Sequence, residues 1–214
     1  PLDGFHCSHS LAKVLRRGTF EVTCNASFAA VIEACAGPRR DGDQTWISGR
    51  ITQSYLALHQ LGHAHSIECW HDGELVGGLY GVGFDRVFCG ESMFSLVPDA
   101  SKVALAWLVA TMKRAGATLL DCQFLTEHLA SMGAIEIGQK RYLSLLKAAQ
   151  RPYSLVTGPA SDPAGRGEPA SEGEALGDGE ALALPDAFGA LLSAASGSSS
   201  SPGNFIAQSF TQTS

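Results

Sequence analysis

Three polar residues in the middle of the chain have the types and spacing of a reactive site. Asp121 and Gln123 lie two positions apart in the apolar segment TLLDCQF, and Glu91 lies in the earlier segment RVFCGESMF. In a β-strand, residues two positions apart face the same side, with Cα atoms about 6–7 Å apart. A carboxylate and a carboxamide on one face, near a second carboxylate, would form a polar substrate site. The alternative is that Asp121 and Gln123 only satisfy backbone groups at a strand end.

A strand–helix–strand unit would place these residues together. RVFCGESMF and TLLDCQF have the apolar content of strands. The segment between them predicts a helix over residues 101–115, with Asp99 or Ser101 as its N-cap and Gly116 at its end. The buried side of this helix repeats at i, i+3, i+4 and i+7, in Leu105, Leu108, Val109 and Met112. Such a unit makes the two strands parallel, and open sheets usually bind ligands at their shared carboxyl ends.

The rest of the chain up to residue 150 alternates between strand and helix patterns. TQSYLALHQL (52–61) predicts a helix, and HSIECW and LVGGLYGVGF predict a hairpin around the Asp72-Gly73 turn. A strand and a short helix are expected within residues 20–36, a strand in GAIEIG (133–138) and a helix in KRYLSLLKAA (140–149). These elements predict an α/β (α+β) fold, a mixed sheet with flanking helices that resembles the N-acetyltransferase fold.

Composition divides the chain into three parts. Residues 1–45 are interpreted as a partial N-terminal region and 46–150 as an acetyltransferase-like domain. Residues 151–214 form a low-complexity acidic tail rich in Gly, Ala, Ser and Pro. We expect residues from about 155 onward to be poorly ordered and dispensable for catalysis, with no more than a transient helix around Leu182–Leu192.

The bulk composition limits the class of protein. A net charge of −6 argues against a general nucleic-acid-binding protein. The longest apolar run, Val103–Met112, is too short to span a bilayer, and no signal peptide is visible, although a chain that begins at Pro1 suggests a missing N-terminal segment. None of the six cysteines has CxxC spacing, which favours reduced thiols. We expect a cytoplasmic monomer without membrane contact.

Two further motifs have simple structural explanations. His59, His63 and His65 suggest a zinc site, but a helix that ends near Gly62 need not place the first two on one face, and no cysteine lies at ligand spacing. A structural role is favoured, and no metal is expected. Residues 78–83 (GLYGVG) imitate a phosphate-binding loop, but they lie within a strand and no helix follows them. A bulge, or a close approach of a ligand to the sheet, explains these glycines better.

Several blocks of the sequence resemble the leucyl/phenylalanyl-tRNA–protein transferases. The blocks are TWISGRITQSYLALHQLGHAHSIECW, GELVGGLYGV, FCGESMFS, ASKVAL, LLDCQF and HLASMGAIEI, and the resemblance extends from about Pro1 to Leu146. It implies a bacterial enzyme that transfers Leu, Phe and less readily Met from aminoacyl-tRNA to proteins that begin with Arg or Lys, which marks them for degradation. It implies no cofactor.

The family's site residues carry over position by position. The resemblance implies that Asp121 and Gln123 are the catalytic pair and that Glu91 faces the aminoacyl-adenosine. The implied substrate-binding residues are Trp46 and Tyr55 for the terminal adenosine, and Phe88, Met93, Met112 and Leu120 for the aminoacyl side chain. Candidates for binding tRNA phosphates are Lys13, Arg16, Arg17, Arg39, Arg40, Lys113, Arg114, Lys140 and Arg141. The sequence departs from the family in the N-terminal segment it lacks, in WISGRI and in its long acidic tail.

Two alternatives remain open at this point. An acetyl-CoA-dependent N-acetyltransferase needs a glycine-rich turn before the 101–115 helix, so that backbone N–H groups can hold the pyrophosphate. The turn here is FSLVPDASK, which contains no glycine, so acetyl-CoA is disfavoured. The second alternative is a non-catalytic module that binds aminoacyl-tRNA or peptide N-termini, and only an activity assay separates it from the transferase.

Overall fold

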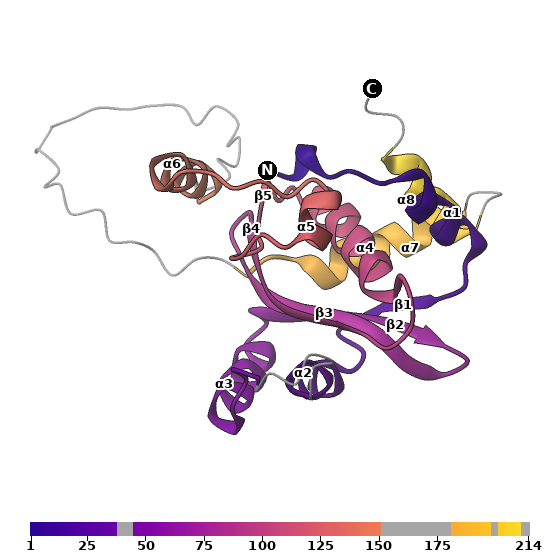
Figure 1. Cartoon of the computed structure of the whole chain (residues 1–214), viewed down its shortest axis with the longest axis horizontal. Helices are drawn as coiled ribbons and strands as arrows, with labels where there is room; N and C mark the ends of the chain where they lie inside the picture. Colours follow the sequence, from indigo (N-terminus) through magenta and orange to yellow (C-terminus); the bar gives the residue numbers. More distant parts are fainter. Residues whose placement is uncertain (38–44, 151–180, 198–200, 211–214) are drawn as a thin grey trace, which may run out of the picture.

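A five-stranded mixed sheet with helices on both faces forms the centre of the protein (Figure 1). The computed structural model describes residues 1–37, 45–150, 181–197 and 201–210. The strands follow sequence order across the sheet: β1 (Glu21–Cys24), β2 (Ala64–His71), β3 (Glu74–Phe84), β4 (Val87–Ser95) and β5 (Leu119–Asp121). Neighbours from β1 to β4 are antiparallel, and β5 runs parallel to β4. The predicted mixed sheet is confirmed.

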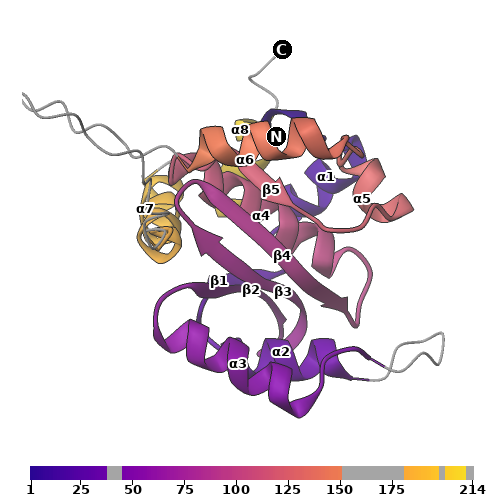
Figure 2. The same ribbon diagram turned by 90° about the vertical axis from the view of Figure 1, so that its left-hand side faces the viewer.

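The helices cover the two faces of the sheet with different elements (Figures 1 and 2). On one face lie α2 (Phe28–Ala36) and α3 (Gly49–Gln60). On the other face lie α4 (Ala100–Arg114), α1 (His9–Arg17), α7 (Leu184–Ser196) and α8 (Pro202–Ser209). The β5 side of the molecule carries η1 (Leu2–Gly4), α5 (Glu127–Ser131) and α6 (Gln139–Ala149). Each face packs on its own apolar core cluster.

The β2–β3 hairpin forms where the sequence predicts it. Asp72 and Gly73 both have positive φ angles, 51° and 80°, as a type I′ turn requires. Further along β3, the pairing with β4 shifts register between Tyr80 and Gly81. A Cβ atom on Gly81 would lie 2.2 Å from the carbonyl oxygen of Cys89, so only glycine fits. The expectation that these glycines permit a bulge is confirmed.

Helix α4 is the main apolar helix that packs on the sheet. All but three of its fifteen residues are buried, including the predicted stripe, because the sheet covers one side and α1, α7 and α8 cover another. The helix is followed by Gly116 in the left-handed region, as predicted. Asp99 occupies the N-cap position, but its side chain accepts no capping hydrogen bond, and Ser101 lies inside the helix.

The strand predicted in residues 133–138 does not form. Gly133 has a φ of 95°, and a Cβ atom there would lie 1.9 Å from the carbonyl oxygen of Gly4. His6 N–H also donates to the Met132 carbonyl at 2.9 Å. The segment is therefore tied to residues 4–6 instead of the sheet, whose last strand offers only three residues for pairing.

The prediction of a poorly ordered tail is wrong for residues 181–197 and 201–210. Leu184, Phe188, Leu191 and Ala195 repeat at i, i+4, i+7 and i+11, and all four are buried along one side of α7. The Phe188 ring lies 5.4 Å from Trp107 of α4. The Gly and Ser content around these helices lowers the average hydrophobicity and hides this stripe. Residues 151–180 lie outside the described part, and the three-part division of the chain stays a prediction.

Helix α8 closes the core against α1. Ile206 and Ala207 are fully buried, and a Cβ atom on Gly203 would lie 1.9 Å from the Leu15 carbonyl oxygen. The Phe210 ring lies 4.7 Å from Phe5. Both chain ends of the described structure thus belong to the same core cluster.

Two predictions of composition can be compared with the described residues. No helix among them is long and apolar enough to cross a membrane. All six cysteines are free thiols, as predicted. Trp107 of α4 is buried in the main core cluster.

Candidate active site

The carboxyl ends of β4 and β5 bring Glu91, Asp121 and Gln123 together. Cys89 of β4 pairs with Asp121 of β5, so Glu91 lies two residues beyond the last paired position of β4. β3 residues Tyr80 and Gly81 pair with Ser92 and Gly90, which leaves Glu91 as the extra residue of a β-bulge. Bulges beside functional sites redirect side chains. The bulge thus contributes to placing the Glu91 carboxylate within reach of Gln123.

Gln123 is placed by an irregular turn. β5 ends at Asp121, and Gln123 has a φ of 60°, in the left-handed region that residues other than glycine rarely adopt. Phe124 N–H donates to the Cys122 carbonyl at 2.6 Å, which closes a γ-turn centred on Gln123. The strand predicted over TLLDCQF therefore ends before Gln123, and this turn, instead of the period of two of a strand, sets the position of Gln123 relative to Asp121. Backbone strain of this kind clusters at functional sites.

A hydrogen-bond network joins the three residues. Gln123 N–H donates to Asp121 Oδ1 at 2.7 Å, and Gln123 Nε2 donates to Glu91 Oε2 at 2.9 Å. The Tyr142 hydroxyl donates to Asp121 Oδ2 at 2.8 Å. Nε2 of Gln123 gives one of its two N–H groups to Glu91, and its carbonyl Oε1, to which no described residue donates, can accept a hydrogen bond from a substrate. The network fixes an acceptor oxygen beside two carboxylates.

Two tyrosines complete the network as donors. Burial and a hydrogen bond to Glu91 raise the pKa of Tyr55, and its ring packs edge-on against Tyr80 with centroids 5.2 Å apart. The hydrogen bond to Asp121 raises the pKa of Tyr142 to about 12. Both hydroxyls therefore keep their protons at neutral pH. Asp121 thus receives the Tyr142 hydroxyl and the backbone N–H of Gln123, and Glu91 receives Nε2 of Gln123.

The two thiols beside the site are poor nucleophiles. Burial, together with Asp121 and Glu91, raises the pKa of Cys89 to about 11. Burial and Asp121 also raise the pKa of Cys122. Since the thiolate is the reactive form, neither cysteine suits a covalent acyl-enzyme mechanism.

A cavity of about 740 Å³ opens beside the pair, with Asp121 and Gln123 in its wall. That volume lies within the range of small-molecule sites. Its walls come from residues 1–5, α4, β5, α5 and the segment 132–137. Phe124 and Ile135 on its rim are 80% and 60% exposed, which is unusual for large apolar side chains with no partner. The cavity is large enough for a substrate group beside Asp121 and Gln123.

The structure separates the predicted binding residues into three groups. Tyr55 and Glu91 join the network, and Leu120 lines the cavity. Phe88 and Met112 are fully buried in the main core cluster, and Met93 packs against it half-buried. Trp46 is 46% exposed ahead of α3, and no described contact connects it to the network. Their roles stay predictions.

Tyr142 is the site residue that the sequence analysis missed. It lies on α6 in register with Leu145, Leu146 and Ala149, which pack on β5 and the start of β4. Arg86 Nε fixes the end of this helix by donating to the Ala149 carbonyl at 3.1 Å. A single hydroxyl on an otherwise apolar helix face was the available signal, because a buried hydroxyl needs a partner.

The histidine motif has a structural explanation. His59 stacks on Phe28 with centroids 4.2 Å apart, and its Nδ1 bonds to the Ala64 carbonyl at 2.8 Å. His65 Nδ1 lies 3.0 Å from Asn25 Nδ2, and burial lowers the pKa of His65 to about 4. No group of three potential metal ligands occurs among the described residues.

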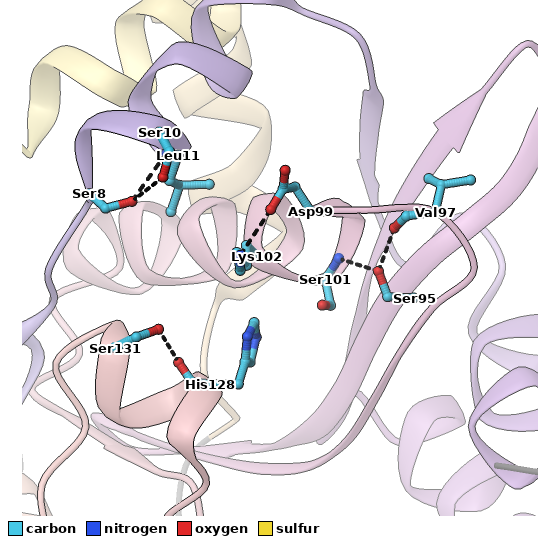
Figure 3. Close-up of polar contacts among 10 residues, drawn as sticks. All are labelled: Ser8, Ser10, Leu11, Ser95, Val97, Asp99, Ser101, Lys102, His128 and Ser131. Carbon is cyan, nitrogen blue, oxygen red and sulfur yellow. Dashed lines mark hydrogen bonds and ion pairs between the residues drawn. The ribbon is translucent and has the colours of Figure 1, made fainter. Parts of the chain in front are cut away.

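The N-terminal end of α4 does not suit a pyrophosphate (Figure 3). Ser101 N–H already donates to Ser95 Oγ at 3.3 Å, and the Asp99 carboxylate pairs with Lys102 at 2.9 Å. His128 lies beside Lys102 in the same view, and burial and Lys102 lower its pKa. A carboxylate at this turn and an occupied amide disfavour the acetyl-CoA alternative.

Comparisons with known proteins agree on one family. Residues 1–147 match the family model described as "Leucyl/phenylalanyl-tRNA protein transferase". A protein of Novosphingobium aromaticivorans named leucyl/phenylalanyl-tRNA–protein transferase is 63% identical over all of this chain and 83% of its own length. Proteins of that name from Zymomonas mobilis and Rhodopseudomonas palustris are 58% and 55% identical over 72% and 68% of the chain. The aligned parts cover 57% and 65% of those two relatives.

Proposed function

Because the chain belongs to the leucyl/phenylalanyl-tRNA–protein transferase family, we propose that it transfers Leu or Phe, and less readily Met, from aminoacyl-tRNA to the N-terminal Arg or Lys of acceptor proteins. The observation that carries the proposal is the network of Glu91, Asp121 and Gln123 at the edge of the sheet. The protein acts as a monomer in the cytoplasm and needs no cofactor. The products are proteins marked for degradation.

The reaction is aminolysis of an ester. The nitrogen of the acceptor's α-amine forms a bond to the ester carbonyl carbon, and the carbonyl oxygen becomes an oxyanion. The carbon–oxygen bond to the ribose then breaks, and the proton released by the nitrogen ends on the ribose oxygen. The aminoacyl ester is already activated, so the protein mainly has to position the amine and handle its proton.

We assign a role to each polar residue, and the network supports these assignments. Gln123 Oε1 accepts a hydrogen bond from the attacking amine, while its Nε2 stays anchored on Glu91. Asp121 orients Gln123 through the backbone N–H and takes part in moving the amine's proton, because each carboxylate oxygen has a second lone pair. Glu91 also accepts from the ammonium of the aminoacyl group. Tyr142 and Tyr55 keep the two carboxylates in place.

The remaining contacts follow from the family resemblance. Trp46 and Tyr55 bind the terminal adenosine, and Leu120 and Met93 contact the aminoacyl side chain at the edge of the core. Phe88 and Met112 support this contact from behind, since both are fully buried. Basic residues for tRNA phosphates lie on α1, at the end of α4 and on α6, and Arg39 and Arg40 lie outside the described residues.

The test is transfer of labelled Leu from charged tRNA to a peptide that begins with Arg, followed in a single turnover. We expect label in the peptide, and none in a matched peptide with an acetylated N-terminus. Binding of both substrates without transfer would favour the non-catalytic module. Acetylation of the same peptide from acetyl-CoA would favour the acetyltransferase.

A further inference from the structure

The cavity beside Gln123 carries only negative side-chain charge. Its charged side chains are those of Asp121 and Glu136, and no Lys, Arg or His side chain is among its described lining residues. Most of the remaining wall is apolar, with Leu105, Val109 and Leu129 at its inner side. An anionic group such as a phosphate finds no cationic side chain among these lining residues. A cation with an apolar stem matches both the charge and the walls.

The carboxylates of Asp121 and Glu136 differ in the hydrogen-bond partners that they already have. Asp121 receives hydrogen bonds on both oxygens from Gln123 and Tyr142. Glu136 is exposed at the cavity, and no described residue donates to it or forms an ion pair with it. A cationic ligand in this cavity would therefore find its free anionic partner in Glu136.

Glu136 is held at a defined place relative to the reacting pair. The segment that carries it begins at Met132, whose carbonyl accepts from His6 N–H, and at Gly133, which lies against Gly4. It ends at α6, whose Tyr142 bonds directly to Asp121. Both ends of the segment are thus fixed, and the exposed Ile135 and Phe124 lie on the rim beside it.

We infer that this cavity receives the first side chain of the acceptor protein and that Glu136 selects a positive charge on it. The inference rests on the proposed function, which places the α-amine at Asp121 and Gln123. With the amine there, the alkyl stem of Arg or Lys lies on Phe124 and Ile135. Its guanidinium or ammonium group pairs with Glu136. Glu136 is a specificity-determining residue, and it takes no part in the bond-forming step.

The experiment compares two peptides that differ only in their first residue, Arg or citrulline, its neutral isostere. Initial rates of Leu transfer from charged tRNA are measured at subsaturating peptide. In the unchanged protein, Arg is preferred. Glu136→Gln should lower kcat/KM for the Arg peptide about tenfold, the size expected for losing a partly exposed charged partner. The loss should appear in KM, and the rate with the citrulline peptide should stay unchanged.

Two variants make the result specific. Glu136→Asp keeps the charge and should restore much of the preference. Glu127→Gln removes an exposed carboxylate from the neighbouring helix α5, outside the cavity lining, and should leave both rates unchanged. Raising the salt concentration should reduce the Arg preference of the unchanged protein, because the pair is exposed.

The outcomes separate the inference from the proposed function. If the unchanged protein transfers Leu but Glu136→Gln keeps its Arg-to-citrulline ratio, Glu136 does not select the acceptor and the inference is wrong. A change in the Leu-to-Phe ratio alone would assign the cavity to the aminoacyl group and also overturn it. Absence of transfer by the unchanged protein would instead contradict the proposed function.

Discussion

The β4–β5 edge and the C-terminal helices α7 and α8 differ in how clearly the sequence predicts them. The strands and helix around the edge have strong local patterns, yet the side chains of the site are placed by a bulge at Glu91 and a γ-turn at Gln123. Helices α7 and α8 lie in a segment of weak composition, yet they form regular helices that complete the core. A strong hydrophobic pattern therefore predicts a helix or strand better than it predicts the positions of site side chains. A short stripe of apolar residues predicts a buried helix better than the average composition of its segment does.

The largest expected effect is on stability and comes from removing α7 and α8. Deleting residues 181–214 exposes the side of α4 that carries Trp107, together with Leu11 and Leu15 of α1. We expect loss of cooperative folding, which differs from the dispensable tail that composition predicts. Thermal unfolding followed by circular dichroism measures it. A shortened chain with unchanged Tm would show that the helices add nothing to the core.

A single substitution tests the same contact more finely. Phe188→Ala should lower the free energy of unfolding by about 3–5 kcal/mol, the usual range for a buried Phe. Ser193→Ala changes an exposed residue of the same helix and should shift it by less than about 0.5 kcal/mol. Equal effects of the two substitutions would contradict the packing of α7 on α4.

At the β4–β5 edge the expected effect is on rate. Gln123→Ala should slow transfer by roughly two to three orders of magnitude, the size of losing one oriented transition-state hydrogen bond. Asp121→Asn should also slow it, because the shape is kept and the charge is lost. The proposed mechanism places both residues on one proton path, so the double variant should be little slower than the slower single variant. Single-turnover transfer and separate tRNA binding measure this.

The control for these variants is folding. Unchanged tRNA affinity and Tm with a slow transfer step would support a catalytic role. Near-normal transfer rates in both single variants would remove the pair from the mechanism. If slow transfer is accompanied by a lower Tm, Asp121 and Gln123 have a structural role at the end of β5 instead of a catalytic one.

A smaller effect concerns pH and the hairpin rather than the site. Burial holds the pKa of His65 at about 4, below the 6.5 of an exposed histidine. The unfolded chain therefore binds more protons between pH 6.5 and 4, so this contribution to stability is complete above pH 6.5 and is lost as the pH falls towards 4. About 2 kcal/mol should be lost between pH 7 and pH 5. Urea unfolding at both pH values measures it.

The matched comparison uses two histidine variants. His65→Gln should make stability less dependent on pH in this interval, and His9→Gln, at a surface position on α1, is the matched variant for comparison. The same slope in all three proteins would show that His65 is not the group responsible.

The smallest expected effect is that of Tyr142→Phe. The substitution keeps the ring, which packs against the cluster of Val87, Leu119 and Ala149, but removes the hydroxyl that donates to Asp121. We expect transfer to slow about tenfold, since one charge-assisted hydrogen bond supports the orientation of Asp121. The acceptor preference for Arg over citrulline should stay, because Glu136 is unchanged. An unaltered rate would make Tyr142 a packing residue only.

Much of the fold could be read from the chain because its signals are local. The Asp72-Gly73 turn, the apolar repeat of α4 and the glycine after it each reflect backbone or packing rules that operate over a few residues. The sequence blocks that resemble the family extend to residue 146, and that resemblance identified the catalytic candidates. Local signals failed for residues 133–138. Their alternating pattern predicts a strand, but Gly133 packs against Gly4, which is far away in the sequence.

By itself, then, the sequence predicted the five strands that form, one over residues 133–138 that does not, most helices, and the grouping of Glu91, Asp121 and Gln123. Only the tertiary structure decided that Tyr142 supports Asp121, that Glu136 faces the same cavity, and that α7 and α8 belong to the core. The physical reason is the sequence distance over which each interaction acts. Turn and helix preferences act between near neighbours, whereas a hydrogen bond, a free charge in a cavity and the burial of a helix face depend on residues that meet only after folding.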